Sequence, residues 1–350
     1  MRQPRLPFCI TRNKLRQAEG PDKEEQMENI KEFMEMAKTE ILSYLPDNLV
    51  KELTVEDNRV VKMNDQILYG LTMRKHDQEQ APTIYMNDIY ERYMNGESLK
   101  ALMAETVHQY LGVIAVPPPE ITNMDLSFEN IKDNLTLKIV EIKRNHEYLS
   151  EVPYIKMGNG FAAVCDITLA DGDGGQLRTT VTRGLMGEME YDMNELFSTA
   201  IERSQINAPA EMSSIRSQLL FEDEPNLLEG RGVISEDEKD NMYVISNKEC
   251  LYGAVTLYYP GVQDKIAERL GENYYVLPSS VNELLLIPES RAPEIKDIAS
   301  MVYEANEHLL EPKDVLSNNI LYYDKDSKRL ETIKSEMVRG IDSPEVAFRS

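Results

Sequence analysis

His146, Glu147 and Ser150 form the stretch of sequence that comes nearest to a known catalytic motif. The zinc-protease motif H-E-x-x-H sets two histidines one helical turn apart, so that both rings bind one metal and the glutamate acts as the base. Ser150 stands where the second histidine would be, so this stretch lacks a ligand pair. The remaining histidines are isolated in the sequence: His76, His108 and His308. We therefore expect no bound metal.

Asp171 and Asp173 have the spacing of the first two ligands in a calcium-binding loop. That loop also needs a third oxygen ligand at its fifth position and a glutamate at its twelfth, where this chain has Gly175 and Thr182. The glycine-rich stretch is more typical of a hairpin turn. The sequence also lacks the G-x-G-x-x-G and P-loop lysine patterns that bind nucleotides, and we expect no cofactor.

The nucleophilic side chains occur without the partners that activate them. Cys165 lies in an apolar run and Cys250 precedes a Leu-Tyr-Gly phrase, so both are interpreted as small core residues. With Cys9 they make three widely spaced cysteines without a C-x-x-C pair, which argues against a disulfide framework and a structural zinc site. Ser279 and Ser280 lack a G-x-S-x-G elbow and a histidine, so we predict a capped turn there.

A cluster of tyrosines occupies residues 82–96. It contains Tyr85, Tyr90 and Tyr93 around Asn87 and Asp88. Tyrosine suits recognition surfaces because it is large, fairly rigid and amphipathic. The same residues also suit the corner between a strand and a helix. The sequence favours the corner and leaves an interaction site as the alternative.

The formal net charge of −23 is the strongest compositional feature. It would repel the phosphate backbone, so free nucleic acid is not an expected ligand. Solubility is the simplest explanation of the charge, and an acidic surface for a basic protein partner is the alternative. The candidate positions are two acidic runs, Glu222, Asp223 and Glu224, and Glu236, Asp237 and Glu238.

The periodicity of the chain predicts an α+β fold with largely antiparallel strands and amphipathic covering helices. A 3.6-residue period favours a helix from Met27 to Leu45, and residues 127–152 are also expected to be helical. Asp192 is expected to begin another helix and Gly271 to end one, while the pair Asp57-Asn58 suits a turn between strands. Leu-Tyr-Gly occurs twice, at residues 68–70 and 251–253. Each copy is predicted to start a half-buried strand in which the glycine lets a neighbour approach.

Three mixed sheet-and-helix units follow from this pattern, and the prolines at 117–119 mark the first linker between them. The predicted boundaries are 1–24 for a basic disordered leader, 25–116 for an N-terminal unit, 117–208 for a middle unit, 209–241 for an acidic mobile connection, 242–325 for a C-terminal unit and 326–350 for a charged tail.

Several stretches carry a resemblance to a known family: "LYGLTMRK", "APTIYMNDIYERYMNGESL", "MYVISNKECLYGAVTLYYPGV" and "YYVLPSSVNELLLIP". They resemble an uncharacterised family from clostridial bacteria and their mobile elements, which bears only a domain-of-unknown-function label. The resemblance runs over residues 25–323. It implies a cytoplasmic α+β protein and assigns neither an activity nor functional residues.

Two functions follow as expectations. The first is a non-enzymatic cytosolic binding or regulatory protein, carried by a phage or mobile element, whose acidic surface meets a basic protein partner. No membrane association is expected, because no window holds the roughly 18 apolar residues of a spanning helix. The alternative is a hydrolase whose carboxylates and histidines come together only in the folded chain.

Overall fold

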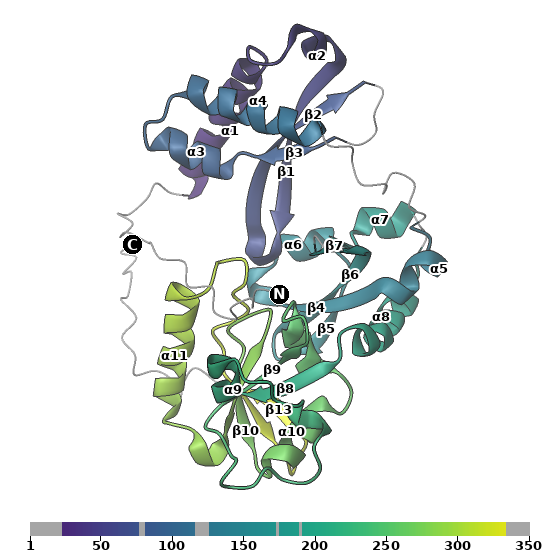
Figure 1. Cartoon of the computed structure of the whole chain (residues 1–350), viewed down its shortest axis with the longest axis vertical. Helices are drawn as coiled ribbons and strands as arrows, with labels where there is room; N and C mark the ends of the chain where they lie inside the picture. The colour runs from purple at the N-terminus through teal and green to yellow at the C-terminus, as the bar shows by residue number, and fades with distance from the viewer. Residues whose placement is uncertain (1–22, 77–80, 116–125, 173–174, 189–190, 334–350) are drawn as a thin grey trace, which may run out of the picture. The chain divides into compact units, whose positions relative to one another are not determined.

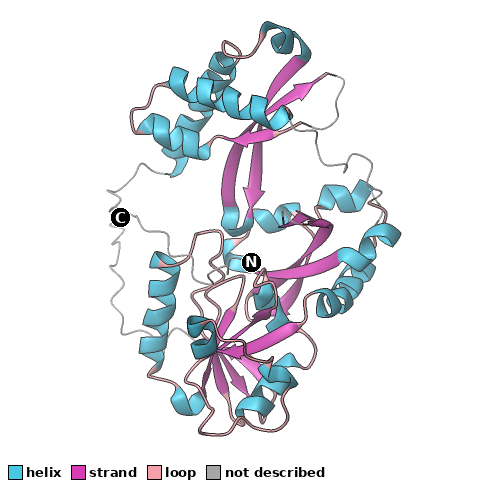
Figure 2. Ribbon diagram, in the orientation of Figure 1, coloured by secondary structure: helices cyan, strands magenta, loops and turns pink. Residues whose placement is uncertain are grey.

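The computed structural model describes residues 23–76, 81–115, 126–172, 175–188 and 191–333 (Figure 1). These residues form an α+β fold with antiparallel sheets, as predicted (Figure 2). They fall into two compact units, which we call the small unit, residues 23–115, and the large unit, residues 126–333. Each unit has its own hydrophobic core. Residues 1–22 of the predicted basic leader, the proline linker and residues 334–350 of the predicted charged tail lie outside the described residues.

The small unit contains a three-stranded antiparallel sheet in the order β1-β2-β3. Its strands are β1 (Leu53–Lys62), β2 (Gln66–Lys75) and β3 (Thr83–Tyr85). β1 and β2 pair over their whole length around the short turn η1 (Met63–Asp65). The sequence predicted a turn at Asp57-Asn58, but β1 continues through it, because the Asn58 amide donates to Thr72 Oγ1 on β2 at 2.7 Å.

Four helices complete the small unit: α1 (Lys23–Ile41), α2 (Asp47–Glu52), α3 (Asn87–Met94) and α4 (Leu99–Ile114). The predicted period is confirmed in α1, where Ile30, Met34, Ala37 and Ile41 are buried. They pack with buried residues of α4 and β2 in one cluster.

The first sheet of the large unit has the order β4-β6-β5, and β7 pairs with the far half of β6. Its strands are β4 (Leu135–Glu141), β5 (Tyr154–Gly158), β6 (Phe161–Gly172) and β7 (Gly175–Thr180). The prediction of a helix over 127–152 is wrong. All seven residues of β4 are buried, including the polar Thr136, Lys138 and Glu141, so the strand lacks the alternation of apolar and polar residues that marks a half-buried strand.

Only short helical turns flank β4 where the sequence predicted one long helix. They are α5 (Phe128–Ile131), η2 (Lys132–Asn134), η3 (Ile142–Arg144) and α6 (Tyr148–Glu151).

The second sheet of the large unit has six antiparallel strands in the order β13-β12-β10-β11-β9-β8. They are β8 (Ala210–Ser214), β9 (Tyr243–Asn247), β10 (Tyr274–Leu277), β11 (Leu284–Pro288), β12 (Leu321–Asp324) and β13 (Arg329–Thr332). Where the sequence predicted a mobile connection over 209–241, the structure has β8, α9 (Ile215–Leu220) and η4 (Leu227–Glu229). Met212 is fully buried, which fixes β8 to the sheet.

Helices of the large unit include α7 (Arg183–Glu188), α8 (Met193–Asn207), α10 (Val262–Leu270) and α11 (Ile295–His308), with 3₁₀ turns η5 (Gly253–Tyr258) and η6 (Glu289–Arg291). The N-cap at Asp192 and the C-terminal Gly271 (φ 78°) agree with the sequence. Within the described residues, no helix is both long enough and apolar enough to cross a bilayer.

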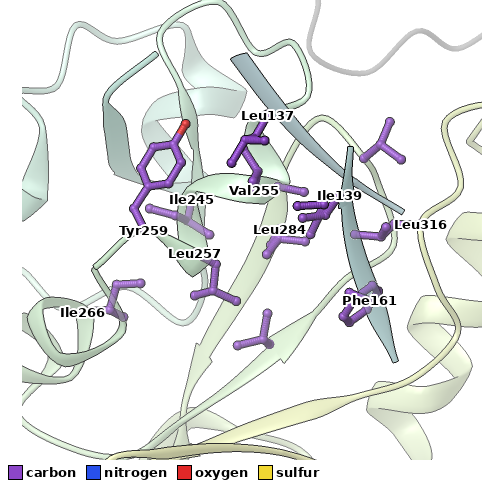
Figure 3. Close-up of a cluster of buried hydrophobic side chains, with 14 of the residues drawn as sticks. Leu137, Ile139, Phe161, Ile245, Val255, Leu257, Tyr259, Ile266, Leu284 and Leu316 are labelled. Carbon is purple, nitrogen blue, oxygen red and sulfur yellow. The ribbon is translucent and has the colours of Figure 1, made fainter. Parts of the chain in front are cut away.

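Both sheets of the large unit contribute to one hydrophobic core, although the sequence placed a boundary between them. Figure 3 shows Leu137 and Ile139 of β4 close to Val255 of η5 and Leu284 of β11. The turn η5 therefore lies where side chains of the two sheets meet, and its residues 253–257 are all buried.

The two Leu-Tyr-Gly phrases have different structures. The first lies inside β2, as predicted. The second was predicted to be a strand and is not one. Cys250 and Tyr252 both have positive φ angles, 48° and 54°, and the chain passes directly into η5. The apolar residues of this phrase are buried on all sides of a tight turn, so their alternation in the sequence does not indicate a strand.

The glycine of each phrase admits a close neighbour, and this part of the prediction is confirmed. A Cβ at Gly70 would lie 2.4 Å from Asn58 Oδ1. A Cβ at Gly253 would lie 2.6 Å from the carbonyl oxygen of Asn282 and 2.7 Å from the backbone nitrogen of Asn247. No real side chain tolerates such contacts.

Candidate functional site

Residues Leu219 to Asp223 form an exposed tip at the end of α9, and we call them the exposed tip. Leu219, Leu220 and Phe221 are 62%, 59% and 59% exposed. Phe221 ends the helix with a left-handed backbone (φ 55°), which is unusual for a bulky residue. Glu222 and Asp223 follow and are exposed as well. Three consecutive large apolar side chains therefore face solvent next to two carboxylates.

The tip is held at both ends by hydrogen bonds to β8. Before it, the Ser214 side chain caps α9 by accepting from the Ser217 nitrogen at 3.1 Å. After it, Glu224 Oε2 accepts from the Ser214 nitrogen at 2.6 Å and from Ser217 Oγ at 2.8 Å. These contacts fix the tip in one geometry relative to the sheet.

Asn226 continues this attachment along the outer edge of β8. Its Oδ1 accepts from the Met212 nitrogen at 3.0 Å, and its Nδ2 donates to the Ala210 carbonyl at 3.0 Å. The side-chain amide thus makes the two bonds that a neighbouring strand would make. Together with Glu224 it covers backbone groups that an edge strand would otherwise expose.

The three adjacent apolar side chains of the exposed tip indicate an interaction surface. Single apolar side chains on a surface are normal, but adjacent ones mark interaction sites, because their hydration costs free energy that a partner removes. A tip that is already ordered loses less conformational entropy on binding than a flexible loop. The exposed tip can therefore act as an apolar anchor with an acidic border.

The acidic residues predicted as interaction positions are thus divided by the structure. Glu222 and Asp223 belong to the exposed tip, whereas Glu224 is used to hold it. In the second run, Glu236 pairs with Lys239 at 3.3 Å and with Arg291 at 3.1 Å.

The other two residues of that second run are also on the surface. Glu238 Oε2 accepts from Ser235 Oγ at 2.7 Å, and Asp237 is exposed. Because Glu236 pairs with Arg291 and with Lys239, which it shares with Glu272, this run offers less unpaired charge than the exposed tip.

The tyrosine cluster forms the strand-to-helix corner that the sequence favoured. Asn87 begins α3; its Nδ2 donates to the Ile67 carbonyl and its Oδ1 accepts from the Tyr69 nitrogen, each at 2.9 Å. Tyr90 and Tyr93 pack on the buried ring of Phe33, with centroid distances of 5.3 and 5.2 Å. Burial raises the pKa of Tyr90 above its ordinary value.

The remaining two residues of that cluster lie nearer to solvent. Tyr85 at the end of β3 is 42% exposed, and Asp88 is exposed in the first turn of α3. The cluster as a whole therefore holds the corner together, and only Tyr85 presents its ring outward.

A buried polar cluster in the large unit was not anticipated from the sequence. Lys138 of β4 and Asp166 of β6 are 4% and 3% exposed, and Lys138 Nζ lies 2.8 Å from Asp166 Oδ1. Thr180 Oγ1 contacts both, at 2.9 Å from Nζ and 2.8 Å from Oδ1. The rings of Tyr148 and Tyr252 lie 5.9 and 5.0 Å from Nζ.

The protonation states of this cluster indicate a structural role and not a role in acid–base catalysis. Burial acts to lower the pKa of Lys138, but Asp166, helped by the two tyrosines, more than offsets it and the pKa is raised. Burial also raises the pKa of Tyr148. An ammonium and a phenol held in these states do not act as bases near neutral pH.

Titratable groups also surround the turn at Tyr252. Burial raises the pKa of Glu283 to about 7. Cys250 was predicted to be a core residue, but it is exposed; partial desolvation of its thiol and the nearby Glu283 raise the pKa of that thiol. The predicted capped turn is present, since Ser280 Oγ accepts from the Asn282 nitrogen at 3.0 Å. Among the described residues, no group of three histidine, cysteine, aspartate or glutamate side chains could hold a metal.

Sequence reasoning missed the apolar half of the exposed tip. The letters Leu219-Leu220-Phe221 next to an acidic run were visible, but α9 is only six residues long and shows no helical period. Exposure of these side chains depends on the bonds from Glu224 and Asn226, which no local pattern reveals.

These features define an α+β protein of two antiparallel-sheet units, one of which presents an ordered apolar and acidic tip. The chain belongs to a family of unknown function, DUF5688, whose model matches residues 30–325. Comparison with curated proteins and with solved structures found no match.

Proposed function

We propose that this chain is a non-enzymatic binding protein that docks a basic protein partner through the exposed tip. The observation that carries the proposal is the ordered display of Leu219, Leu220 and Phe221 beside the exposed carboxylates of Glu222 and Asp223. Cytoplasmic residence and carriage by a phage or mobile element belong to the same proposal. Their support is the free thiols of Cys165 and Cys250 and the family resemblance.

The magnitudes are adequate for specific binding. Complete burial of a leucine or phenylalanine side chain contributes about 1.5–3 kcal/mol. Burying the exposed part of three such side chains would contribute roughly 3–5 kcal/mol, a useful anchor for an interface of ordinary size. The two carboxylates act mainly on the association rate, and their effect is screened beyond about 8 Å at physiological salt.

A hydrolase is the second candidate, and one observation favours it. Glu283, with a pKa of about 7, has the acidity that suits a general acid or base. The thiol near it is a poor partner, because the raised pKa of Cys250 leaves little thiolate at neutral pH. The binding proposal therefore has the stronger support.

The test compares three forms of the full chain as bait in a lysate of the native host: wild type, Leu219→Ser/Phe221→Ser, and Ile206→Ser. Ile206 is 61% exposed on α8 and serves as a matched apolar control. Quantitative mass spectrometry should find a basic protein that wild type and the control retain and the tip variant loses. Retention of every captured protein by the tip variant would overturn the proposal.

The purified partner then allows a kinetic test. The double reversal Glu222→Lys/Asp223→Lys should lower the association rate about tenfold at low salt and much less at high salt. The same reversal at Asp237 and Glu238 is the control and should change the rate less than threefold. Equal effects of the two reversals, or a salt-independent rate in the wild type, would contradict a role for the tip carboxylates.

A further inference from the structure

β1 is an edge strand whose outer side has no strand partner among the described residues. The His76 nitrogen donates to the Glu52 carbonyl at 3.0 Å, so residues 52 and 76 form a hydrogen-bonded pair. This pair fixes which residues of β1 direct their backbone N–H and C=O groups toward β2. In an antiparallel ladder, alternate residues exchange both bonds, so Thr54 and Glu56 face β2. The backbone groups of Val55 and Asp57 therefore point away from β2, toward the outer edge.

A groove lies beside this edge, between β1 and the helices next to it. Its volume is about 440 Å³, within the range of peptide and ligand sites. It is lined by Glu35 and Lys38 of α1, Leu42 just after α1, Val50 of α2, and Leu53 and Val55 of β1. Leu42 and Val50 are exposed although they are large and apolar. The groove thus combines a strand edge with an apolar wall.

The charges around the groove favour a cation. Glu35 and Asp57 each contact Lys38, at 3.5 Å and 2.6 Å. Two carboxylates share one ammonium, so this end of the groove carries a net charge of about −1 and Glu35 is 72% exposed. The hydrogen bond to Asp57 raises the pKa of Lys38, which keeps its charge fixed.

We propose that this groove binds an extended segment of a basic partner protein, which adds to β1 as a further strand. Main-chain bonds to the Val55 N–H and carbonyl and to the Asp57 carbonyl supply affinity, since the Asp57 N–H is bonded to its own carboxylate. Side chains at alternate positions supply specificity. Residues two positions apart in a strand lie on the same face. If an aliphatic residue of the segment lies beside Val55 and Leu42, a residue two positions away therefore lies beside Asp57 and Glu35. The segment chosen therefore has an aliphatic residue and a lysine or arginine two positions apart, in an order that depends on the direction of the added strand.

The probe is a fluorescein-labelled peptide of about eight residues with blocked ends, in which valine and arginine take turns at every second position and threonine fills the positions between them. Fluorescence anisotropy with the full chain should show saturable binding with a Kd on the order of 10–100 μM, since ordering a short peptide offsets much of its contact energy. A peptide of the same sequence with N-methyl groups on alternate amides cannot pair along β1. It should bind at least tenfold more weakly.

Matched variants locate the site. Asp57→Lys reverses a charge in the groove, and Glu56→Lys makes the same change on the opposite face of β1. Val55→Pro removes one outward N–H while leaving the ladder with β2 intact. We expect Asp57→Lys and Val55→Pro to weaken binding at least tenfold and Glu56→Lys to change it less than threefold.

Hydrogen exchange separates the groove from the exposed tip. Amides of residues 53–57 should become at least tenfold more protected when the peptide binds, and Leu219→Ser/Phe221→Ser should bind it normally. Equal binding of the N-methylated peptide, equal loss in Glu56→Lys, or protection confined to other segments would overturn the proposal. Absence of saturable binding up to 1 mM peptide would do so as well.

Discussion

Replacing Lys138 by methionine should test what the buried ion pair contributes. Nζ lies 2.8 and 3.0 Å from the two Asp166 oxygens, and both side chains are almost fully buried. Methionine keeps the length of the side chain but leaves the carboxylate with only the Thr180 hydroxyl as donor. Removing one partner of such a pair typically costs 3–5 kcal/mol, because the other charge stays buried and uncompensated.

The double variant Lys138→Met/Asp166→Leu separates this penalty from the net value of the pair. Replacing both charges by apolar groups of similar size often changes stability little, because the desolvation cost disappears with the attraction. We expect the double variant to lie within about 1 kcal/mol of the wild type. The coupling free energy between the two sites should then be about 3 kcal/mol or more.

Hydrogen exchange measured by mass spectrometry is the suitable assay. The chain has no tryptophan, and two units with separate cores do not unfold as one two-state system. A loss of 3–5 kcal/mol corresponds to exchange that is roughly two to four orders of magnitude faster in β4. Amides of α4 in the small unit provide an internal control. A loss below 1 kcal/mol in Lys138→Met, or a double variant as unstable as the single one, would refute the reasoning.

Two further changes test the turn at Tyr252. The folded pKa of Glu283, about 7, is above its ordinary value of 4.5, so its contribution to stability is present below pH 4.5 and is lost as the pH rises through 7. Glu283→Gln should therefore match the wild type at pH 4 and exceed its stability by about 1–3 kcal/mol at pH 8, measured by hydrogen exchange in β11; a pH-independent difference would contradict this. Gly253→Ala should cost at least about 3 kcal/mol, because its Cβ would meet backbone atoms that cannot move aside. The control Gly187→Ala, with nothing within 4 Å, should be neutral or slightly stabilising, and equal losses in the two variants would refute the steric argument.

Sequence reasoning succeeded where a local pattern decides the structure. The strand Gln66–Lys75 and the helix closed by Gly271 match the prediction because alternation and a C-terminal glycine act over a few residues. It failed for β4, since Lys138 breaks the apolar run and its partner Asp166 is distant in the sequence. It also failed for the second Leu-Tyr-Gly, where packing between two sheets imposes a turn on a phrase with strand propensity.

The candidate site was predicted in part for the same reason. The acidic run Glu222 to Glu224 is visible in the sequence, but its division into two exposed carboxylates and one anchoring carboxylate is not. That division depends on the Ser214 nitrogen and on Asn226, which are placed by β8.

The attachment of Glu224 and Asn226 to β8 also bears on the order in which the chain assembles. These contacts span only 10 and 16 residues, whereas the strand that pairs with the other side of β8 begins at Tyr243. A chain synthesised from its N-terminus can therefore close one side of β8 before β9 has been made. When β9 is made, only one edge of β8 is still free to pair. β9 therefore adds to that edge and not to the opposite one.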